Sequence, residues 1–183
     1  MILSDTAIRD FGVSGGIEGF IEKNVQPASY DITLSDQFVE YGNDSIIDVN
    51  DKSSFTVDTV SVDEDGSIII PPNGFVIGSS QEVFHFDAST AGSIEGRSSV
   101  GRAGIQVHPV AGWIDPGFNG TLTLPLKNMG RHPVKLTAGM RIAQVVFYGL
   151  DNPAHVTYDL KQDSRYNGQN GPTASRIAEG ENE

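Results

Sequence analysis

Hydrophobic and polar positions alternate with a period of two along much of the chain. The alternation is clear at Tyr30, Ile32 and Leu34, and it returns over residues 68–70 and 75–77. Successive side chains of a strand point to opposite faces of a sheet, so this pattern predicts half-buried strands. Further strands are expected over residues 120–126, 133–136 and 141–148, the last as a nearly continuous apolar stretch that suits a buried strand.

The first residues and several short segments follow other patterns. Ser4, followed by Ala7, Ile8 and Phe11, predicts a short helix in which the Ser4 hydroxyl accepts a first-turn backbone N–H. We expect the glycines at 12, 15 and 16 to end it. Turns flanked by strands are expected at Pro72-Asn73-Gly74, Asp115-Pro116-Gly117 and Asn119-Gly120, the last being a pair typical of tight hairpins.

Two segments depart from the strand pattern. Residues 44–66 are polar and acidic with few large apolar side chains, so we expect only one or two poorly packed strands there. The chain from Gln162 is rich in Gly, Asn, Gln, Ser and Glu, and such a segment cannot bury enough apolar area to fold alone. We therefore predict one β domain over residues 1–160 and a flexible tail over 161–183 that only a ligand or a neighbour would order.

Composition narrows the class of protein. Twenty-one glycines and nine prolines, scattered along 183 residues, favour an all-β domain with many turns. The net charge of -12 argues against a broad nucleic-acid surface, and the lack of cysteine excludes disulfides, thiol nucleophiles and thiolate-bound zinc. No apolar stretch approaches the ~20 residues of a membrane span, and the start lacks a signal-peptide pattern. We expect a soluble protein of the cytoplasm, or of the host cytoplasm if viral.

The candidate chemistry lies in a polar block between Glu95 and Asp115. It holds two arginines, Arg97 and Arg102, with adjacent serines and glycines that let a ligand approach the backbone. These groups suit a polyphosphate cradle. From the residues alone, a solvated turn with surface arginines is an equal alternative.

Four segments resemble, in the same order, the motifs of dCTP deaminases and their bifunctional deaminase-dUTPase relatives. The resemblance runs from Met1 to about Arg176 and is weakest over 44–66. It implies a distorted β-barrel of the dUTPase type, a homotrimer, and active sites between subunits that bind dUTP or dCTP with Mg²⁺. The segments are Gln26–Asp31, Gly96–Arg102, Ala111–Gly120 and Arg165–Pro172, while Arg141–Gln144 resembles the fourth motif of trimeric dUTPases.

The resemblance also implies roles for individual residues. Asp115 would touch the sugar hydroxyl and orient a water that attacks the α-phosphorus. Arg165 stands where the family usually has lysine, which keeps the charge but changes the geometry. The implied nucleotide-binding residues are Arg97, Ser98, Ser99, Arg102, Val110, Ala111, Ile114, Gln144, Tyr158, Arg165 and Gln169.

Three of these interpretations have plain structural alternatives. An aspartate before Pro-Gly is an ordinary turn opener, so Asp115 could be only that. Asp31 matches a motif that helps to place the metal through water, and is at least as readily a structural aspartate; no direct protein ligand to Mg²⁺ is expected. We expect His108 to be an interior histidine with satisfied hydrogen bonds, and we give it no catalytic role.

One departure from the family pattern bears on the reaction. The family's deaminase glutamate falls ten positions after the aspartate matched by Asp115, and Pro125 stands there. Proline cannot shuttle a proton, whereas phosphorus chemistry needs only water, an aspartate and a metal. The sequence therefore favours hydrolysis of dUTP to dUMP and pyrophosphate. The alternatives are a dCTP deaminase with a non-standard site and a catalytically inactive nucleotide-binding or sequestering protein.

Overall fold

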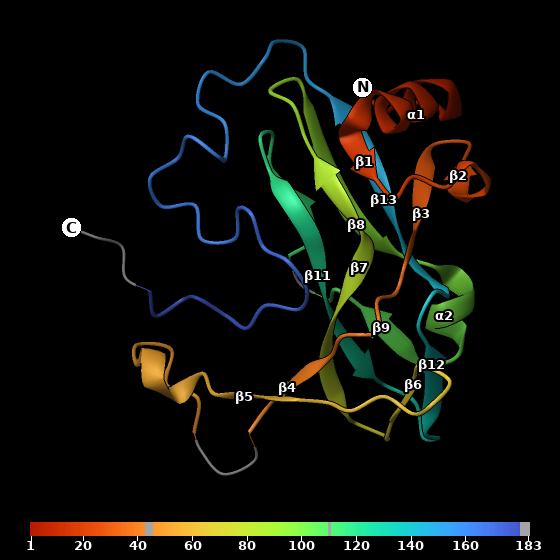
Figure 1. Cartoon of the computed structure of the whole chain (residues 1–183), viewed down its shortest axis with the longest axis vertical. Coiled ribbons are helices and arrows are strands. Elements are labelled where there is room, and N and C mark those ends of the chain that lie inside the picture. Colours follow the sequence, from red (N-terminus) through yellow and green to blue (C-terminus); the bar gives the residue numbers. More distant parts are fainter. Residues whose placement is uncertain (43–45, 110, 180–183) are drawn as a thin grey trace.

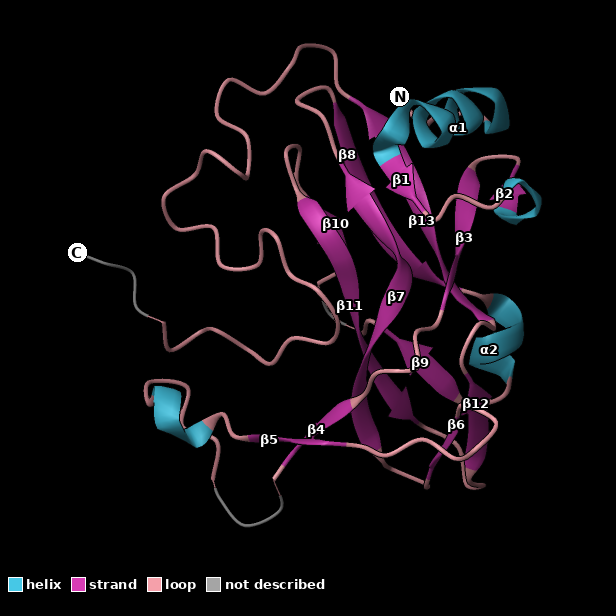
Figure 2. Cartoon of the chain, in the orientation of Figure 1, coloured by secondary structure: helices cyan, strands magenta, loops and turns pink. Residues whose placement is uncertain are grey.

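The computed structural model describes residues 1–42, 46–109 and 111–179 of the chain (Figure 1). Strands form most of the regular structure, with one helix beside the N-terminus and a long C-terminal segment without regular structure along one side (Figure 2). The predicted mainly β fold with a short N-terminal helix is confirmed. In the part of the chain described, no helix is both long and apolar enough to cross a membrane.

The larger sheet carries the strands that form one wall of the candidate site. Its neighbouring strands pair antiparallel, and the long pair β7 and β11 forms its centre. The order is β5 (Val57–Thr59), β4 (Val39–Tyr41), β7 (Phe75–His85), β11 (Asn119–Asn128) and β9 (Ile105–Val107), with β1 (Ile17–Glu18) also paired to β7.

A second antiparallel sheet faces the first, and a separate two-stranded ribbon lies at one end (Figure 1). The order of the second sheet is β10 (Trp113–Ile114), β8 (Thr90–Gly96), β13 (Arg141–Gly149), β3 (Ser29–Thr33) and β2 (Val25–Gln26). The ribbon pairs β6 (Ser67–Ile70) with β12 (Val134–Thr137).

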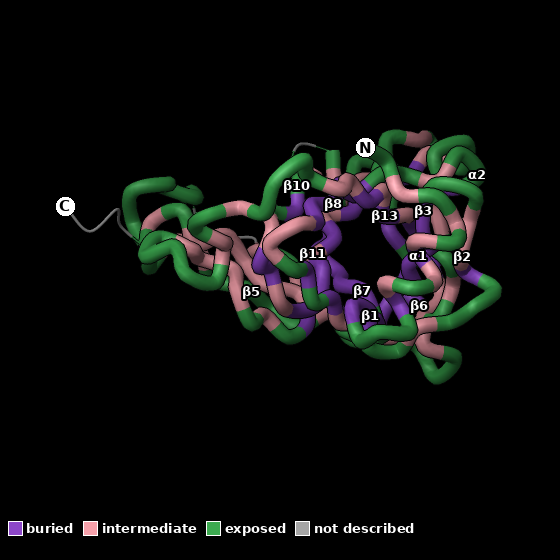
Figure 3. The backbone as a smooth tube through the Cα atoms, turned by 90° about the horizontal axis from the view of Figure 1, so that it is seen from above, coloured by how far each residue is buried: buried purple, intermediate pink, exposed green. Residues whose placement is uncertain are grey.

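The apolar positions of the alternating pattern meet between the sheets. Tyr30, Ile32 and Leu34 of the β3 region are fully buried, as are Leu124 and Leu126 of β11. Viewed from above, the strands surround a buried interior (Figure 3). Within the described ranges, the ladders leave separate sheets rather than a closed cylinder, so the dUTPase-like β fold is an open, distorted barrel.

The N-terminal helix α1 (Asp5–Phe11) forms as predicted, but two details differ. The Ser4 side chain makes no capping bond; its backbone carbonyl instead accepts from the N–H of Ile8 at 2.9 Å. Gly12 does not end the helix, because it keeps a right-handed helical conformation and starts a π-helical turn, η1 (Gly12–Gly16). The chain reverses at Gly15, whose φ of 98° suits glycine.

The turn predictions are partly confirmed. Gly74 N–H donates to the carbonyl of Pro71 at 2.8 Å, closing the expected turn between β6 and β7. The hairpin expected at Asn119-Gly120 is wrong, because both residues already pair with β7 inside β11. The remaining short helices are η2 (Glu22–Asn24), η3 (Lys52–Ser54) and α2 (Ser98–Arg102).

The acidic segment is poorly packed where it is described. Its one strand, β5, is exposed along its length, as the lack of large apolar side chains predicted. The prediction for residues 44 and 45 lies outside the described residues.

Candidate active site

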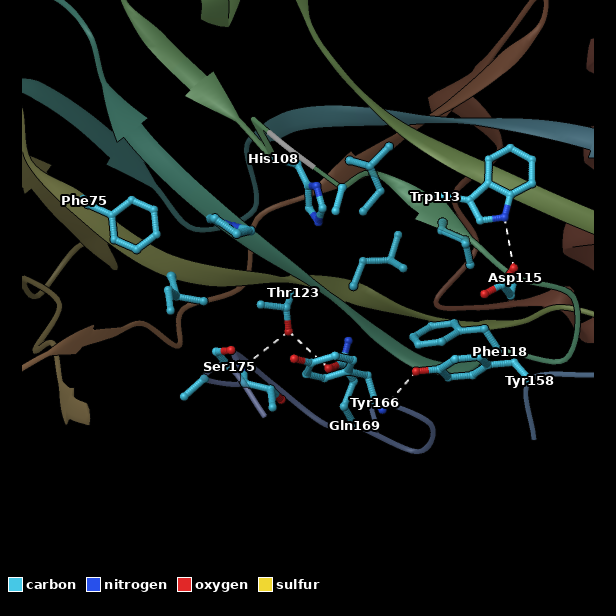
Figure 4. A pocket seen from close by; sticks show the side chains of 18 of the residues that line it. Phe75, His108, Trp113, Asp115, Phe118, Thr123, Tyr158, Tyr166, Gln169 and Ser175 are labelled. Atoms are coloured by element: carbon cyan, nitrogen blue, oxygen red, sulfur yellow. Dashed lines mark hydrogen bonds between the residues drawn. The ribbon is translucent and has the colours of Figure 1, made fainter. Parts of the chain in front are cut away.

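A cavity of about 390 Å³ opens between the larger sheet, β10 and the C-terminal segment (Figure 4). Its walls are mostly aromatic and aliphatic, with a few polar groups among them. Such a lining suits a planar, partly apolar ligand with a few oriented hydrogen bonds. Five of the predicted catalytic and nucleotide-binding residues line it, namely Ala111, Ile114, Asp115, Tyr158 and Gln169.

Asp115 follows β10 at the mouth of this cavity. Phe118 N–H donates to its carbonyl at 3.2 Å, so the residue does open a turn. Its side chain has a second contact, because the indole Nε1–H of Trp113 donates to Oδ1 at 3.0 Å (Figure 4). Trp113 is 58% exposed and packs against Tyr148 with ring centroids 5.6 Å apart. The turn and the indole together fix where this carboxylate points.

The C-terminal segment lies along β11 and forms the floor of the cavity. Thr121 N–H donates to the carbonyl of Gln169 at 3.0 Å, and the Gln169 side chain donates to the carbonyl of Thr121 at 2.7 Å. Glycine is required where the two segments meet. A Cβ at Gly120 (φ 138°) would lie 2.6 Å from the Gln169 carbonyl oxygen, and one at Gly117 (φ 86°) would collide with Thr157.

His108 and Pro125 lie opposite each other in one wall of the cavity, where the hydrogen-bond ladder between β9 and β11 ends. His108 N–H donates to the Pro125 carbonyl at 2.9 Å. In an antiparallel pair the partner would donate back, but proline has no N–H. β9 therefore ends at Val107, and His108 takes a left-handed backbone conformation with φ 50°. β11 stays continuous because the Pro125 nitrogen faces β9 rather than β7.

The expectation of a satisfied interior histidine at 108 is wrong. The side chain is half-buried, and its Nδ1 atom is buried without a hydrogen-bond partner among the described residues. Burial lowers the pKa of His108, which keeps the imidazole neutral near neutral pH. The sequence carried no signal for this, because the orientation depends on the missing N–H of Pro125, a residue far along the chain.

A second, more open cleft of about 640 Å³ holds part of the predicted phosphate cradle. Arg97, Ser98 and Gln144 line it, and its wall shares Ile94 and His108 with the first cavity. The cavity and the cleft therefore lie next to each other in a single chain, with Ile94 and His108 between them.

Asp31, on β3, is a buried aspartate that holds an arginine of this cleft. It is 2% exposed, and its Oδ1 and Oδ2 pair with Arg97 Nε at 3.2 Å and Arg141 Nη1 at 3.1 Å, respectively. Ser29 donates to the Gln144 side chain at 2.7 Å. A buried carboxylate held by two guanidinium groups fixes the direction of both arginines.

The remaining predicted residues lie outside both hollows. Ser99 and Arg102 are exposed on α2, and Arg165 lies in the C-terminal segment beyond the cavity. Val110 lies outside the described residues. Thr123 and Tyr166 line the cavity but escaped the sequence interpretation, although Tyr166 stands beside Arg165 in the same motif.

Direct metal ligation finds little support in the side chains. Among the described residues, no group of three or more His, Asp or Glu could hold a metal ion. Both oxygens of Asp31 are already engaged by arginines. A hard cation such as Mg²⁺ commonly binds through substrate phosphates and water, with one or two carboxylates, and the residues fit that mode.

Comparison with known proteins gives consistent matches. A model of the family described as dCTP deaminase-like matches residues 2–150. The chain is 42% identical to a "dCTP deaminase, dUMP-forming" of Methanosphaerula palustris, over 98% of this chain and 97% of that protein. A protein of the same name from Dictyoglomus thermophilum is 38% identical, over 97% and 95%.

A solved structure shows the same fold. The 2'-deoxycytidine 5'-triphosphate deaminase of Agrobacterium tumefaciens superposes with a TM-score of 0.64 at 23% identity. The match covers 80% of this chain and 48% of that chain, so this chain spans about half the length of that structure.

Proposed function

The chain belongs to the dCTP deaminase-like family, and from this premise we propose that it hydrolyses dUTP to dUMP and pyrophosphate in the presence of Mg²⁺. One observation carries the proposal. Among the described residues that line the cavity, Asp115 is the single carboxylate, and Trp113 holds it in place. The position that would carry a deaminase glutamate holds Pro125, which also lines the cavity.

The chemistry follows from this arrangement. The Asp115 carboxylate accepts a hydrogen bond from a water and orients it toward the α-phosphorus. The water oxygen bonds to phosphorus as the bond to the pyrophosphate oxygen breaks, and the water's protons pass to the carboxylate and solvent. Bound Mg²⁺ would draw charge from the phosphate oxygens.

We further propose that the complete site forms between copies of the chain in a homotrimer. Asp115 and the C-terminal segment line one hollow, whereas Arg97, Ser98 and Gln144 line another. Arg102 is exposed on α2 and free to reach a neighbouring copy. A triphosphate lying across the interface would meet the carboxylate of one copy and the arginines of the next, which satisfies both halves of the predicted site.

Two other functions have specific support. The curated relatives are named dCTP deaminases, which favours deamination by a base other than the family glutamate. Pro125 in the cavity wall, with the phosphate cleft retained, favours a binding protein without catalysis.

One assay separates the three. The purified protein with Mg²⁺ is incubated with dUTP or dCTP, while pyrophosphate, ammonia and bound nucleotide are followed. Hydrolysis predicts pyrophosphate from dUTP, and Asp115→Asn lowers its rate by at least about a hundredfold while nucleotide still binds. Ammonia from dCTP would establish deamination instead. Bound nucleotide without either product would establish a binding protein.

A Pro125→Glu variant provides a second test of the same reasoning. Ammonia release from dCTP by this variant alone would show that the remainder of a deaminase site is intact. Ammonia release at equal rates by the natural chain and the variant would contradict the role given to Pro125.

A further inference from the structure

His108 is a polar group of the cavity that the hydrolysis does not use. Figure 4 shows its ring pointing into the space between the sheet and the C-terminal segment. Its Nδ1 atom, next to the backbone, is buried without a partner among the described residues. The nitrogen at the outer end of the ring, Nε2, is therefore the one that faces the cavity.

The other polar groups of the described cavity wall already have hydrogen-bond partners. The Tyr158 hydroxyl accepts from Tyr166 N–H at 3.1 Å, and the Tyr41 hydroxyl accepts from Ser175 N–H at 3.0 Å. Thr123 Oγ1 lies 3.3 Å from the Gln169 side chain. These groups hold the C-terminal segment in place, whereas no hydrogen bond fixes the His108 ring among the described residues.

The buried nitrogen also decides where the imidazole proton resides. The pKa of His108 is lowered by burial, so the ring is neutral and carries one proton. A contact of the ring with the residue's own backbone opposes the lowering of the pKa, but Nδ1 has no partner in hydrogen-bond geometry among the described residues. A proton on Nδ1 would therefore be a buried N–H without a hydrogen bond, which native proteins avoid more strictly than an unfilled acceptor. We assign the proton to Nε2, so the ring presents an N–H donor to the cavity.

A donor at this place distinguishes the two pyrimidines. Uracil carries an oxygen acceptor at C4, whereas cytosine carries an amino donor there. Pro125 lies opposite His108 and pairs with Ile77, and both are apolar residues of the lining, so they cannot compensate an unmatched pair of donors. We propose that His108 Nε2–H donates to O4 of uracil and makes the cavity selective for uracil over cytosine nucleotides. This inference rests on the proposed function.

The backbone supports a dedicated role for this side chain. A φ of 50° is uncommon for a residue other than glycine, and histidine is among the side chains that tolerate it. The conformation follows from the ladder that ends opposite Pro125. Pro125, which stands where a deaminase would have its glutamate, is therefore also the residue opposite which the ladder ends and the His108 ring enters the cavity.

The test measures binding without catalysis. The chain has a single tryptophan, Trp113, which lines the cavity and reports binding by its fluorescence. The probes are the α,β-imido analogues of dUTP and dCTP, which resist cleavage at the α-phosphorus. The natural chain is expected to bind the uracil analogue about tenfold more tightly, the discrimination typical of one hydrogen bond.

Two variants and one control complete the binding test. His108→Phe keeps a ring without a donor, and His108→Gly removes the side chain and tolerates the left-handed conformation. Both variants are expected to bind the two analogues about equally tightly, mainly because they bind the uracil analogue more weakly than the natural chain does. His132→Phe, at an exposed histidine outside the cavity, should leave the preference unchanged. An equal or reversed preference in the natural chain, or a preference that survives in His108→Phe and His108→Gly, overturns the proposal.

A measurement on the natural chain does not depend on the variants folding. Nitrogen-15 NMR of labelled histidines is expected to show the Nε2–H tautomer for His108, and the Nδ1–H tautomer would overturn the proposal. The two hypotheses fail separately. A uracil preference without pyrophosphate release refutes hydrolysis alone, whereas hydrolysis with an unaltered preference in the His108 variants refutes the present proposal alone.

Discussion

Glu82 is a buried carboxyl group that takes no part in the cavity. It is 1% exposed on β7, and it accepts hydrogen bonds from Thr33 N–H at 3.0 Å and from the Thr33 hydroxyl at 2.8 Å. Burial raises the pKa of Glu82, although the hydrogen bonds from Thr33 act in the opposite direction. The Glu82 side chain therefore joins the β3 region to β7, and its contribution to the free energy of unfolding depends on pH.

A Glu82→Gln variant should reveal this dependence. A group whose pKa is raised by folding contributes stability that is complete below its unfolded value, ordinarily 4.5, and that is lost as pH rises through the folded value. Glutamine does not titrate, so the melting temperature of the variant relative to the natural chain should increase with pH. Thermal melts over about pH 4 to about pH 8 measure this difference in melting temperature. The other carboxylates are common to both chains, so their contributions to the difference cancel. A difference that stays constant would contradict the raised pKa.

Trp113 acts on the reaction through the carboxylate that it holds. Trp113→Phe keeps the packing on Tyr148 but removes the N–H that donates to Asp115 Oδ1. Hydrogen bonds to charged groups contribute about 1.5–3 kcal/mol, so kcat for dUTP should fall about tenfold to a hundredfold with little change in KM. The matched control, Tyr148→Phe, should leave both unchanged, and a Trp113→Phe enzyme with normal kcat would refute the positioning role.

At the scale of elements, the C-terminal segment forms the cavity with β11 rather than only covering it. Gln169 bonds the Thr121 carbonyl, and its Oε1 accepts from the Thr123 hydroxyl. Gly168 N–H donates to the Asn119 carbonyl at 2.7 Å. The segment has almost no regular structure, so its position depends on a small number of hydrogen bonds to the sheet, among them these bonds to β11 and the one from Ser175 N–H to the Tyr41 hydroxyl of β4.

Gln169→Ala should therefore loosen this segment without unfolding the sheets. Losing two side-chain hydrogen bonds is expected to raise KM for dUTP about tenfold or more and to speed proteolysis after residue 160. Gln162→Ala, an exposed position in the same segment outside the cavity, is the control. Equal KM and equal cleavage in the two variants would show that the Gln169 contacts do not hold the segment.

At the scale of the whole molecule, the sequence predicts local features better than the site. The alternating pattern located most of the strands, because their apolar faces meet in one core. It misplaced the hairpin at Asn119-Gly120, because that pair is taken up by the long β7 and β11 ladder. The separation of Asp115 from Arg97 and Ser98 was equally beyond a linear pattern, since β10 pairs with the first half of β8 whereas Arg97 and Ser98 follow the end of β8.

A trimer with shared sites makes a sharp prediction for mixed assemblies. Arg102→Ala and Asp115→Asn should each be nearly inactive alone. When the two are unfolded and refolded together, random mixing places an intact Asp115 opposite an intact Arg102 at about one quarter of the interfaces. About one quarter of natural activity should return. Activity that stays at the level of the separate variants would mean that each site belongs to a single copy.

Gly117 and Gly120 leave the space in which Thr157 and Gln169 rest, and the hydrogen bonds of the neighbouring Thr121 join positions 48 and 50 apart in sequence. Contacts so distant form only after the strand that receives them exists. Docking of the segment should therefore be a late, separate step of folding that completes the pocket after β11 has formed. Amides of residues 168–171 should accordingly exchange with deuterium sooner than those of β11, and equal rates would mean that strand and segment form together.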